Sequence, residues 1–196
     1  MPDTADTRQL YIVLSQTGTW LSRAIKIFTR ARYNHASLSF SEDLQQMYSF
    51  GRLRPRNPFL AGFVQENAFG GTFARFPKTK ALVIALPVSE AQYTAIRSHV
   101  TRMYASREEY HYNFLGILCA AVRIAHTRDS YYYCSEFVAE VLQTFTVEGA
   151  EQLRGVIQPE HLLRLPHSVL YQGLLREYTP PEHTAPSRCF AGRYPA

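Results

Sequence analysis

The residues best suited to chemistry are a cysteine and a histidine that lie far apart in the sequence. Cys134 stands in "YYYCSEFVAEVL" (residues 131–142), and a helical pattern begins at or just after it. The positive end of a helix dipole lowers the pKa of a thiol, so this position favours the nucleophilic thiolate. Backbone N–H groups at the same helix start could stabilise an oxyanion. Cys134 is therefore a candidate nucleophile, and the alternative is a thiol that only fills the core.

His35 is the candidate base for this thiol. It opens a predicted strand over residues 34–40 and shares one face of it with Ser37 and Ser39, because successive strand residues point to opposite faces. The other face is apolar, which predicts a half-buried strand with His35 pointing toward whatever packs over it. We expect the helix that begins at Cys134 to pack there. The alternative is a histidine that only lies at the surface.

A third group should orient the histidine ring, as in other hydrolases that use an activated nucleophile. Ser49 lies on the next predicted strand, residues 45–51, and its position slightly favours it. Glu66 is the rival, because a carboxylate would hold an imidazolium more firmly. Tyr33 directly precedes the histidine strand, and its hydroxyl could serve an oxyanion.

Aromatic residues near these positions have two interpretations. Tyr133 is the last of three tyrosines before Cys134, and they form either the cleft wall or the end of a buried strand. Residues 52–72 are rich in Pro and Gly at both ends, which predicts a loop with a short extended piece near Phe63. Phe63 and Phe69 in this segment either line the substrate cleft or fill the core.

Strands and helices are predicted on both sides of these positions. The run "TKALVIALP" is the strongest strand pattern and is expected to be central in the sheet. Ser89 and Gln92 form a capping box at the start of the helix that follows. The Pro-rich end lacks periodicity and is expected to be a tail. The predicted elements are strands at 9–14 and 79–87, helices within 17–30, 89–107, 113–126 and 158–165, one domain over 1–177 and a tail over 178–196.

Composition excludes several classes of protein. The chain has 196 residues, of which 46% are hydrophobic and 19% charged, so it can bury a proper core. The net charge of +5 comes from arginines that are spread along the chain, which does not indicate nucleic-acid binding but allows a weak attraction to an anionic membrane surface. The longest apolar stretch, residues 114–122, is too short to span a bilayer.

Cysteine usage and the N-terminus indicate a compartment. Three cysteines without a CxxC pair, Cys119, Cys134 and Cys189, favour a reducing environment. The first residues are polar and acidic and lack the features of a signal peptide. We expect a cytoplasmic protein that needs neither a metal nor an organic cofactor. The sequence does not indicate an oligomeric state.

The order of these motifs resembles that of a known superfamily. Histidine precedes cysteine, and the segments "YNHASLSF", "MYSFGR", "GFVQENAFGG", "YYYCSEFVAEVL" and "PEHLL" follow one another over residues 9–165. This order resembles the permuted NlpC/P60 superfamily of papain-like cysteine hydrolases, and within it the YiiX/YebB-like branch. The lecithin–retinol acyltransferase group is related to that branch.

The resemblance implies a fold, a site and a reaction. The fold would be α+β and papain-like, with an antiparallel, partly barrel-like sheet and a packed cysteine helix. Cys134 would be the nucleophile and His35 the base, with Ser49 or Glu66 as the third residue. The thiolate would attack the carbonyl of a peptide, amide or other acyl-bearing small substrate and form an acyl-enzyme.

The chain also departs from the relatives of this branch. The acyltransferase relatives carry a second histidine on the strand after the first, and "QQMYSF" has none here. This difference favours a peptidase or amidase over a lipid acyltransferase. A binding module that keeps the shell without the activity is the third alternative.

Overall fold

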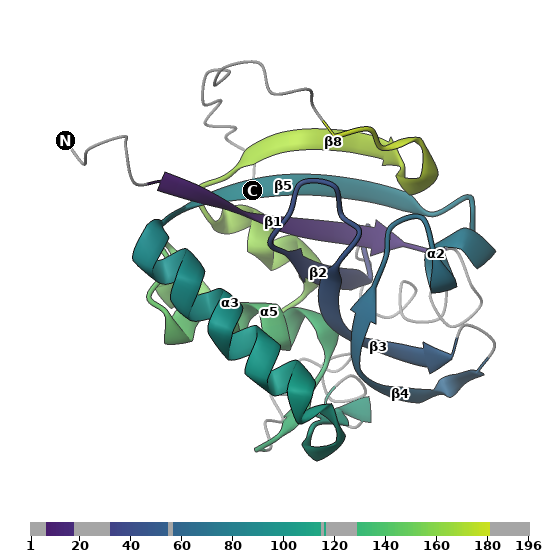
Figure 1. Ribbon diagram of the computed structural model, residues 1–196, viewed down its shortest axis with the longest axis horizontal. Coiled ribbons are helices and arrows are strands. Elements are labelled where there is room, and N and C mark those ends of the chain that lie inside the picture. The colour runs from purple at the N-terminus through teal and green to yellow at the C-terminus, as the bar shows by residue number, and fades with distance from the viewer. Residues whose placement is uncertain (1–6, 18–31, 55–56, 115, 117–128, 181–196) are drawn as a thin grey trace.

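The protein is an α+β domain built on one sheet of eight strands. The computed structural model describes residues 7–17, 32–54, 57–114, 116 and 129–180. The strand order is β7-β6-β4-β3-β2-β1-β5-β8, and every pairing is antiparallel except that of β6 with β7. Figure 1 shows β8 along one edge of the sheet and α2 at its far end. The strands are β1 (Thr7–Gln16), β2 (His35–Ser39), β3 (Met47–Arg54), β4 (Asn57–Glu66), β5 (Lys80–Ser89), β6 (His111–Tyr112), β7 (Tyr131–Tyr132) and β8 (Ser168–Leu174).

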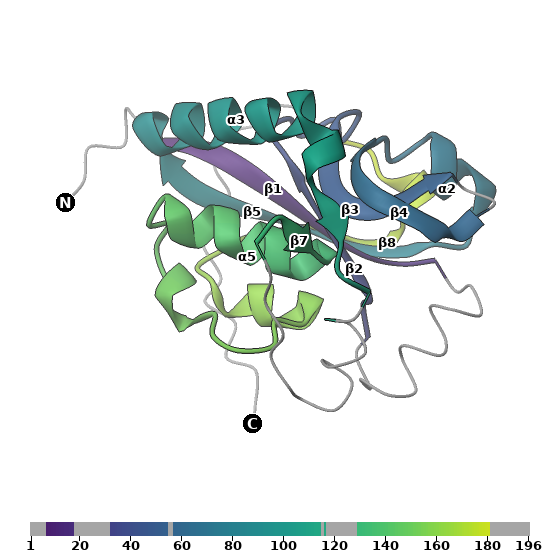
Figure 2. The ribbon, with the colours of Figure 1, turned by 90° about the horizontal axis from the view of Figure 1, so that it is seen from below.

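The helices of the described residues differ in length and in their place on the sheet. α3 and α5 lie side by side over one face (Figure 2), and β7 leads directly into α5. The described helices are α2 (Gly71–Arg75), α3 (Glu90–Ala105) and α5 (Cys134–Thr144), with 3-10 helices at Arg107–Glu109, Ala150–Gln152, Pro159–Arg164 and Leu175–Glu177. None of the helices in the described ranges is long and apolar enough to cross a bilayer.

The core has one part on each face of the sheet. The larger cluster joins Ile12 and Leu38 of the sheet to Phe137 of α5 and includes the buried side of α3. A smaller cluster around Met47 and Phe73 covers the opposite face. Alternation along the strands explains this division, because neighbouring residues of one strand point to different faces.

Several elements confirm the sequence pattern. β1, β2 and β3 form where apolar and polar residues alternate or β-branched residues gather. β5 is an interior strand, as its apolar run predicts, but it lies next to the edge strand β8 rather than at the centre of the sheet. The capping box of α3 is present: the Ser89 side chain accepts a hydrogen bond from the Gln92 N–H, and the Gln92 side chain accepts one from the Ser89 N–H. α5 begins at Cys134 itself.

Two expectations need correction. Residues 52–72 are not mainly a loop, because β4 runs for ten residues and pairs with β3 along its length. Cross-strand pairing and the burial of Phe63 and Val64 outweigh the local effect of Pro and Gly. The sheet is also open, running from β7 at one edge to β8 at the other, rather than partly closed into a barrel. Of the predicted helix over 158–165, Pro159–Arg164 form a 3-10 helix.

Some predictions fall on residues that the structure does not describe. The predicted helix within 17–30, most of the one within 113–126, and Cys119 and Cys189 lie outside the described residues, as does the tail from residue 181. Tyr178 belongs to the smaller core cluster, and its hydroxyl donates a hydrogen bond to the Glu42 carbonyl at 2.8 Å. The first residue of the predicted tail therefore packs against the sheet domain.

Candidate active site

β2 places His35 at one end of the sheet. His35 pairs with Ser15 of β1, and the preceding Asn34 N–H donates to the Ser15 carbonyl at 3.1 Å. The next residues of β2 alternate, and Ala36 belongs to the core cluster that also contains Phe137 of α5. α5 therefore packs on the apolar face of β2, not on the face of His35 as the sequence suggested. The helix reaches the histidine through its N-terminal end.

Glu66 is the partner of the histidine ring. The His35 Nε2 atom lies 3.0 Å from Glu66 Oε2 and 3.2 Å from Oε1, and the side chains are only 17% and 10% exposed. Ser49 Oγ is 3.3 Å from the same nitrogen but donates a hydrogen bond to Glu66 Oε2 at 2.8 Å. The slight preference for Ser49 is therefore not supported. The carboxylate holds the ring, and Ser49 supports the carboxylate.

Two further residues complete the surroundings of this carboxylate. Ser37 Oγ donates to Glu66 Oε2 at 2.7 Å, so two hydroxyl groups serve one oxygen. A Cβ atom on Gly51 would lie 3.3 Å from Glu66 Oε1 and 3.3 Å from His35 Cε1. The absence of a side chain at position 51 thus leaves the space that the histidine–glutamate pair occupies. The sequence pattern places Ser37 on the face of His35 but indicates a role in the site for neither Ser37 nor Gly51.

Cys134 lies beside this pair at the first residue of α5. The residue is 5% exposed, and its Sγ atom lies 3.9 Å from the Asn34 carbonyl oxygen. The His35 side chain and the N–H groups of Ala36 and Ser135 lie near enough to the sulfur to lower its pKa. Because Nε2 faces Glu66, Nδ1 is the ring nitrogen left for the thiol.

The charges of His35 and Glu66 stabilise one another. Burial disfavours the imidazolium most, but the Glu66 charge and the hydrogen bonds with Cys134 and Glu66 outweigh it, so the pKa of His35 is raised well above its ordinary value. Burial likewise disfavours the Glu66 carboxylate, yet His35, Ser37 and Ser49 hold the pKa of Glu66 below its ordinary value. The pair is therefore ionised near neutral pH.

The same surroundings favour the thiolate. Burial raises the pKa of Cys134, but the hydrogen bond and the charge of His35, together with the N–H groups of Ala36 and Ser135, lower it below its ordinary value overall. The start of α5 adds the positive end of a helix dipole. The surroundings thus favour Cys134 as a thiolate, His35 as an imidazolium and Glu66 as a carboxylate, with the imidazolium between the two anions.

The other predicted site residues lie away from the sulfur or in the core. The hydroxyl of Tyr33 accepts a hydrogen bond from Gln172 Nε2, and that of Tyr133 accepts one from the Ile157 N–H, so both have structural partners. Phe63 is 1% exposed and stacks on Phe50 with ring centroids 4.9 Å apart, which matches the interpretation as core. Phe69 is 46% exposed.

The three tyrosines before Cys134 divide between these roles. Tyr131 and Tyr132 form β7, which pairs with β6, and Tyr132 packs against Phe50 with ring centroids 5.2 Å apart. Tyr133 is buried at the start of α5. They are therefore the end of a short strand and a helix start that together set the position of Cys134.

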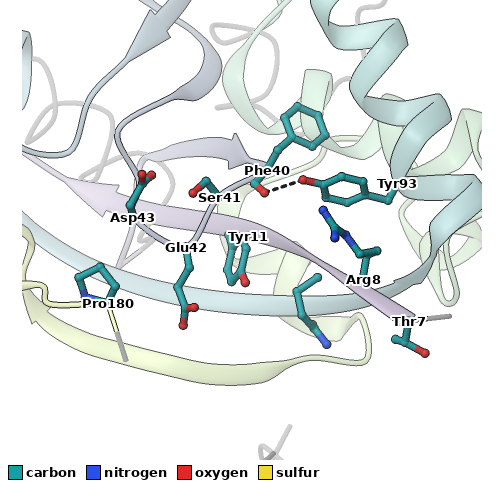
Figure 3. Close-up of a pocket in the computed structure, with 10 residues that line it drawn as sticks. Thr7, Arg8, Tyr11, Phe40, Ser41, Glu42, Asp43, Tyr93 and Pro180 are labelled. Atoms are coloured by element: carbon teal, nitrogen blue, oxygen red, sulfur yellow. Dashed lines mark hydrogen bonds between the residues drawn. The ribbon is translucent and has the colours of Figure 1, made fainter. Parts of the chain in front are cut away.

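A cavity of about 480 Å³ lies away from this site. Its lining includes Tyr11, Phe40 and Glu42, at the opposite end of β2 from His35. Figure 3 shows the Tyr93 hydroxyl donating to the Phe40 carbonyl, at 2.8 Å, and Arg8 beside the Tyr93 ring. None of the residues that bear the thiol, the imidazole or the carboxylate reaches this cavity.

Comparisons with protein-family models, with curated proteins and with solved structures find no match to this chain. Within the described part of the chain, no cluster of three or more His, Cys, Asp or Glu side chains could hold a metal ion. The candidate site therefore rests on the geometry of its own residues.

Proposed function

We propose that this protein is a cysteine hydrolase that attacks an amide or ester carbonyl through Cys134, and that it is a permuted NlpC/P60-type, papain-like enzyme. The observation that carries the proposal is the buried His35–Glu66 ion pair, at 3.0 Å, beside a thiol at the first residue of a helix. A thiol that only fills a core has no need of an ionised, oriented imidazole. Perturbed pKa values that depend on a specific charged partner are typical of functional sites.

The first half of the reaction forms an acyl-enzyme. The Cys134 thiolate attacks the carbonyl carbon, and the carbonyl oxygen gains the negative charge. The N–H groups in the first turn of α5 have no acceptor within the helix and can stabilise this oxyanion. The His35 imidazolium then gives its proton to the leaving amine or alcohol as the bond to the carbonyl carbon breaks.

The second half releases the acyl group. Neutral His35 takes a proton from water, which attacks the thioester carbon, and the thiolate leaves. Glu66 keeps the imidazole in one orientation and stabilises its charge in both halves. Transfer to another acceptor would differ only in the molecule that replaces water. Of the two phenylalanines that were candidates for the substrate cleft, Phe63 is buried in the core and Phe69 is exposed.

Covalent trapping tests this proposal. Wild-type protein incubated with an activated aryl ester should release the phenol in a burst and gain the acyl mass on Cys134, as read by intact and peptide mass spectrometry. Cys134→Ala should gain no adduct there. His35→Ala should fold normally but form the adduct about a hundredfold or more slowly, because it lacks the base and the imidazolium.

A matched variant separates an activated thiol from an accessible one. His99→Ala removes a partly buried histidine on α3 that packs against Phe145 and should leave the acylation rate unchanged. If His35→Ala and His99→Ala behave alike, or if the wild-type thiol reacts no faster than a small free thiol, the hydrolase proposal fails. A binding module would give that result.

A further inference from the structure

An arginine and a tyrosine occupy the two strands that flank β4, at the same end of the sheet as the candidate site. Arg52 follows Gly51 on β3 and pairs with Ala61 of β4. Gly62 pairs with His111 of β6, and the same antiparallel register places Ala61 opposite Tyr112. The methyl side chain of Ala61 is therefore the only side chain between Arg52 and Tyr112 along this row of paired residues.

The β6–β7 pair sets Tyr112 beside the nucleophile. Tyr112 pairs with Tyr132 of β7, and the Asn113 N–H donates to the Tyr132 carbonyl at 2.9 Å. Cys134 follows two residues after Tyr132. Tyr112 also packs against the larger core cluster, with its ring 4.6 Å from that of Phe114. The strand pair thus holds the tyrosine ring close to the N-terminal end of α5.

The charges around Tyr112 keep it a hydrogen-bond donor. Burial raises its pKa most, the Cys134 and Glu66 charges raise it further, and the Arg52 charge only partly opposes them. The phenol therefore stays protonated across the pH range in which the thiolate forms. It can donate to an anion and cannot itself become one.

Arg52 carries a positive charge that acts on Tyr112. Its side chain is half-buried, and its Cζ atom lies 5.6 Å from the centre of the Phe76 ring, which comes from the segment after α2. Burial lowers the pKa of Arg52 and its electrostatic interaction with Tyr112 opposes that, so the two side chains share one electrostatic environment. A partly desolvated guanidinium that lies on an aromatic ring is well suited to bind a planar carboxylate with two hydrogen bonds.

We propose that Arg52 and Tyr112 bind a carboxylate of the substrate close to the scissile carbonyl, so that the preferred substrates are amides or esters that carry a second, anionic group. This inference rests on the proposed attack by Cys134. The guanidinium would pair with the carboxylate, and the phenol would donate to one of its oxygens. Neutral acyl compounds would bind the same site less tightly.

Two pairs of alkylating reagents test the carboxylate site. Iodoacetate and iodoacetamide differ in charge at nearly equal size, and 3-maleimidopropionate and N-ethylmaleimide form a second pair of longer reach. Cys134 forms a thioether with each reagent: iodide leaves the iodoacetyl reagents, and the maleimides add without a leaving group. The measured quantity is the ratio of the two alkylation rates within each pair, at fixed ionic strength. His35 also attracts anions, so the ratio is compared between wild type and variants.

Arg52→Gln should lower the anionic-to-neutral rate ratio about tenfold in at least one reagent pair, as expected for the loss of a charge-assisted bidentate contact. Its rate with the neutral reagent should remain within about twofold of wild type, which also shows an intact site. Tyr112→Phe should lower the ratio by a smaller factor. Arg54→Gln, an equal charge change at an exposed position two residues away, should leave it unchanged.

The outcomes distinguish the inference from the function on which it rests. Equal ratios in wild type and Arg52→Gln for both pairs would overturn the carboxylate site, even where Cys134 is highly reactive. Equal loss of rate with anionic and neutral reagents would also overturn it, because Arg52 would then support the thiolate instead. A wild-type thiol of ordinary reactivity would refute the hydrolase proposal, and the rate ratio would still report on Arg52.

Discussion

Replacement of Glu66 by Gln should uncouple the thiolate from the histidine while it preserves the shape of the site. Two carboxylate oxygens lie 3.0 and 3.2 Å from His35 Nε2. Opposite charges about 4 Å apart attract by about 4 kcal/mol at an effective dielectric constant of about 20, and desolvation offsets part of this. A hydrogen bond to a charged group contributes a net stabilisation of about 1.5–3 kcal/mol, whereas a hydrogen bond between neutral groups contributes about 1 kcal/mol.

The difference that Glu66→Gln should produce is therefore about 1–2 kcal/mol, which is a factor of about 5–30 in the population of the thiolate–imidazolium form. The assay is the rate of Cys134 alkylation by iodoacetamide as a function of pH. Near pH 6 the variant should react about 5–30 times more slowly than wild type. Near pH 10 the two rates should converge, because an ordinary thiol with a pKa of about 8.5 is then deprotonated without help.

This dependence on pH separates an electrostatic role for Glu66 from a structural one. A Gln side chain can still accept the hydrogen bonds that Ser37 and Ser49 donate. Ser49→Ala, which removes one of these donors and keeps the carboxylate, should slow the reaction near pH 6 by a smaller factor. An electrostatic role for Glu66 is refuted if Glu66→Gln reacts like wild type near pH 6, or if its rate is lowered by the same factor at every pH.

Three further predictions follow from the packing and charges of the site. Gly51→Ala should slow alkylation of Cys134 about tenfold, because the added Cβ would displace the His35–Glu66 pair. In the control Gly62→Ala the nearest atoms to the added Cβ belong to the Leu53 side chain, so the alkylation rate should not change. Equal alkylation rates in the two variants would contradict the crowding at position 51. Phe63→Ala should lower the free energy of unfolding, measured by urea titration, by about 3–5 kcal/mol, and Phe69→Ala should lower it by far less. A larger loss of stability in Phe69→Ala than in Phe63→Ala would place Phe63 in the cleft. The pKa of Glu66 is lowered in the folded state, so its contribution to stability is present above its unfolded pKa near 4.5 and is lost as the pH falls through the lower folded value. The free energy of unfolding, measured by urea titration between pH 3 and 6, should therefore fall less steeply toward low pH in Glu66→Gln than in wild type. The same pH dependence in both proteins would show that Glu66 does not gain stability from its partners.

Local patterns in the sequence located the histidine and the cysteine but not the way in which they meet. The start of α5 follows from its amphipathic run, and the alternation around His35 follows from the two-residue period of β2. Which face the helix covers depends on where its apolar stripe can be buried. Phe137 and Ala36 join one cluster, so the apolar face of β2 takes the helix and His35 points to the other side. A pattern within one strand cannot show this.

The third member of the site was harder to predict because its strand is defined by pairing with the preceding strand rather than by its own residue pattern. β4 has a proline and several small residues, and only its pairing with β3 makes it a continuous strand. That pairing carries Glu66 opposite Met47 and brings it to the histidine. Tyr112 lies on a strand of two residues, which is too short for any periodicity to appear. Non-local contacts therefore decide which polar residues converge on Cys134.

The charge balance of the site explains why so many hydrogen-bond donors surround it. A thiolate, an imidazolium and a carboxylate have a net charge of about −1 in a nearly dry environment, which would be costly without compensation. Hydroxyl groups of Ser37 and Ser49 serve the carboxylate, and backbone N–H groups of Ala36 and Ser135 serve the sulfur. Acylation removes the thiolate charge, so the N–H groups near the sulfur can then bind the oxyanion that forms when water attacks the thioester.

A substrate carboxylate bound at Arg52 would meet the same net charge before and after the attack. The thiolate becomes a neutral thioester in the acylation step, but the imidazolium gives its proton to the leaving group in the same step. The net charge of Cys134, His35 and Glu66 therefore stays at about −1. The contact with Arg52 then stabilises the first complex and the acyl-enzyme alike. Interactions of this kind lower KM without raising kcat, so selectivity for the anionic substrate should appear in binding rather than in the acylation step.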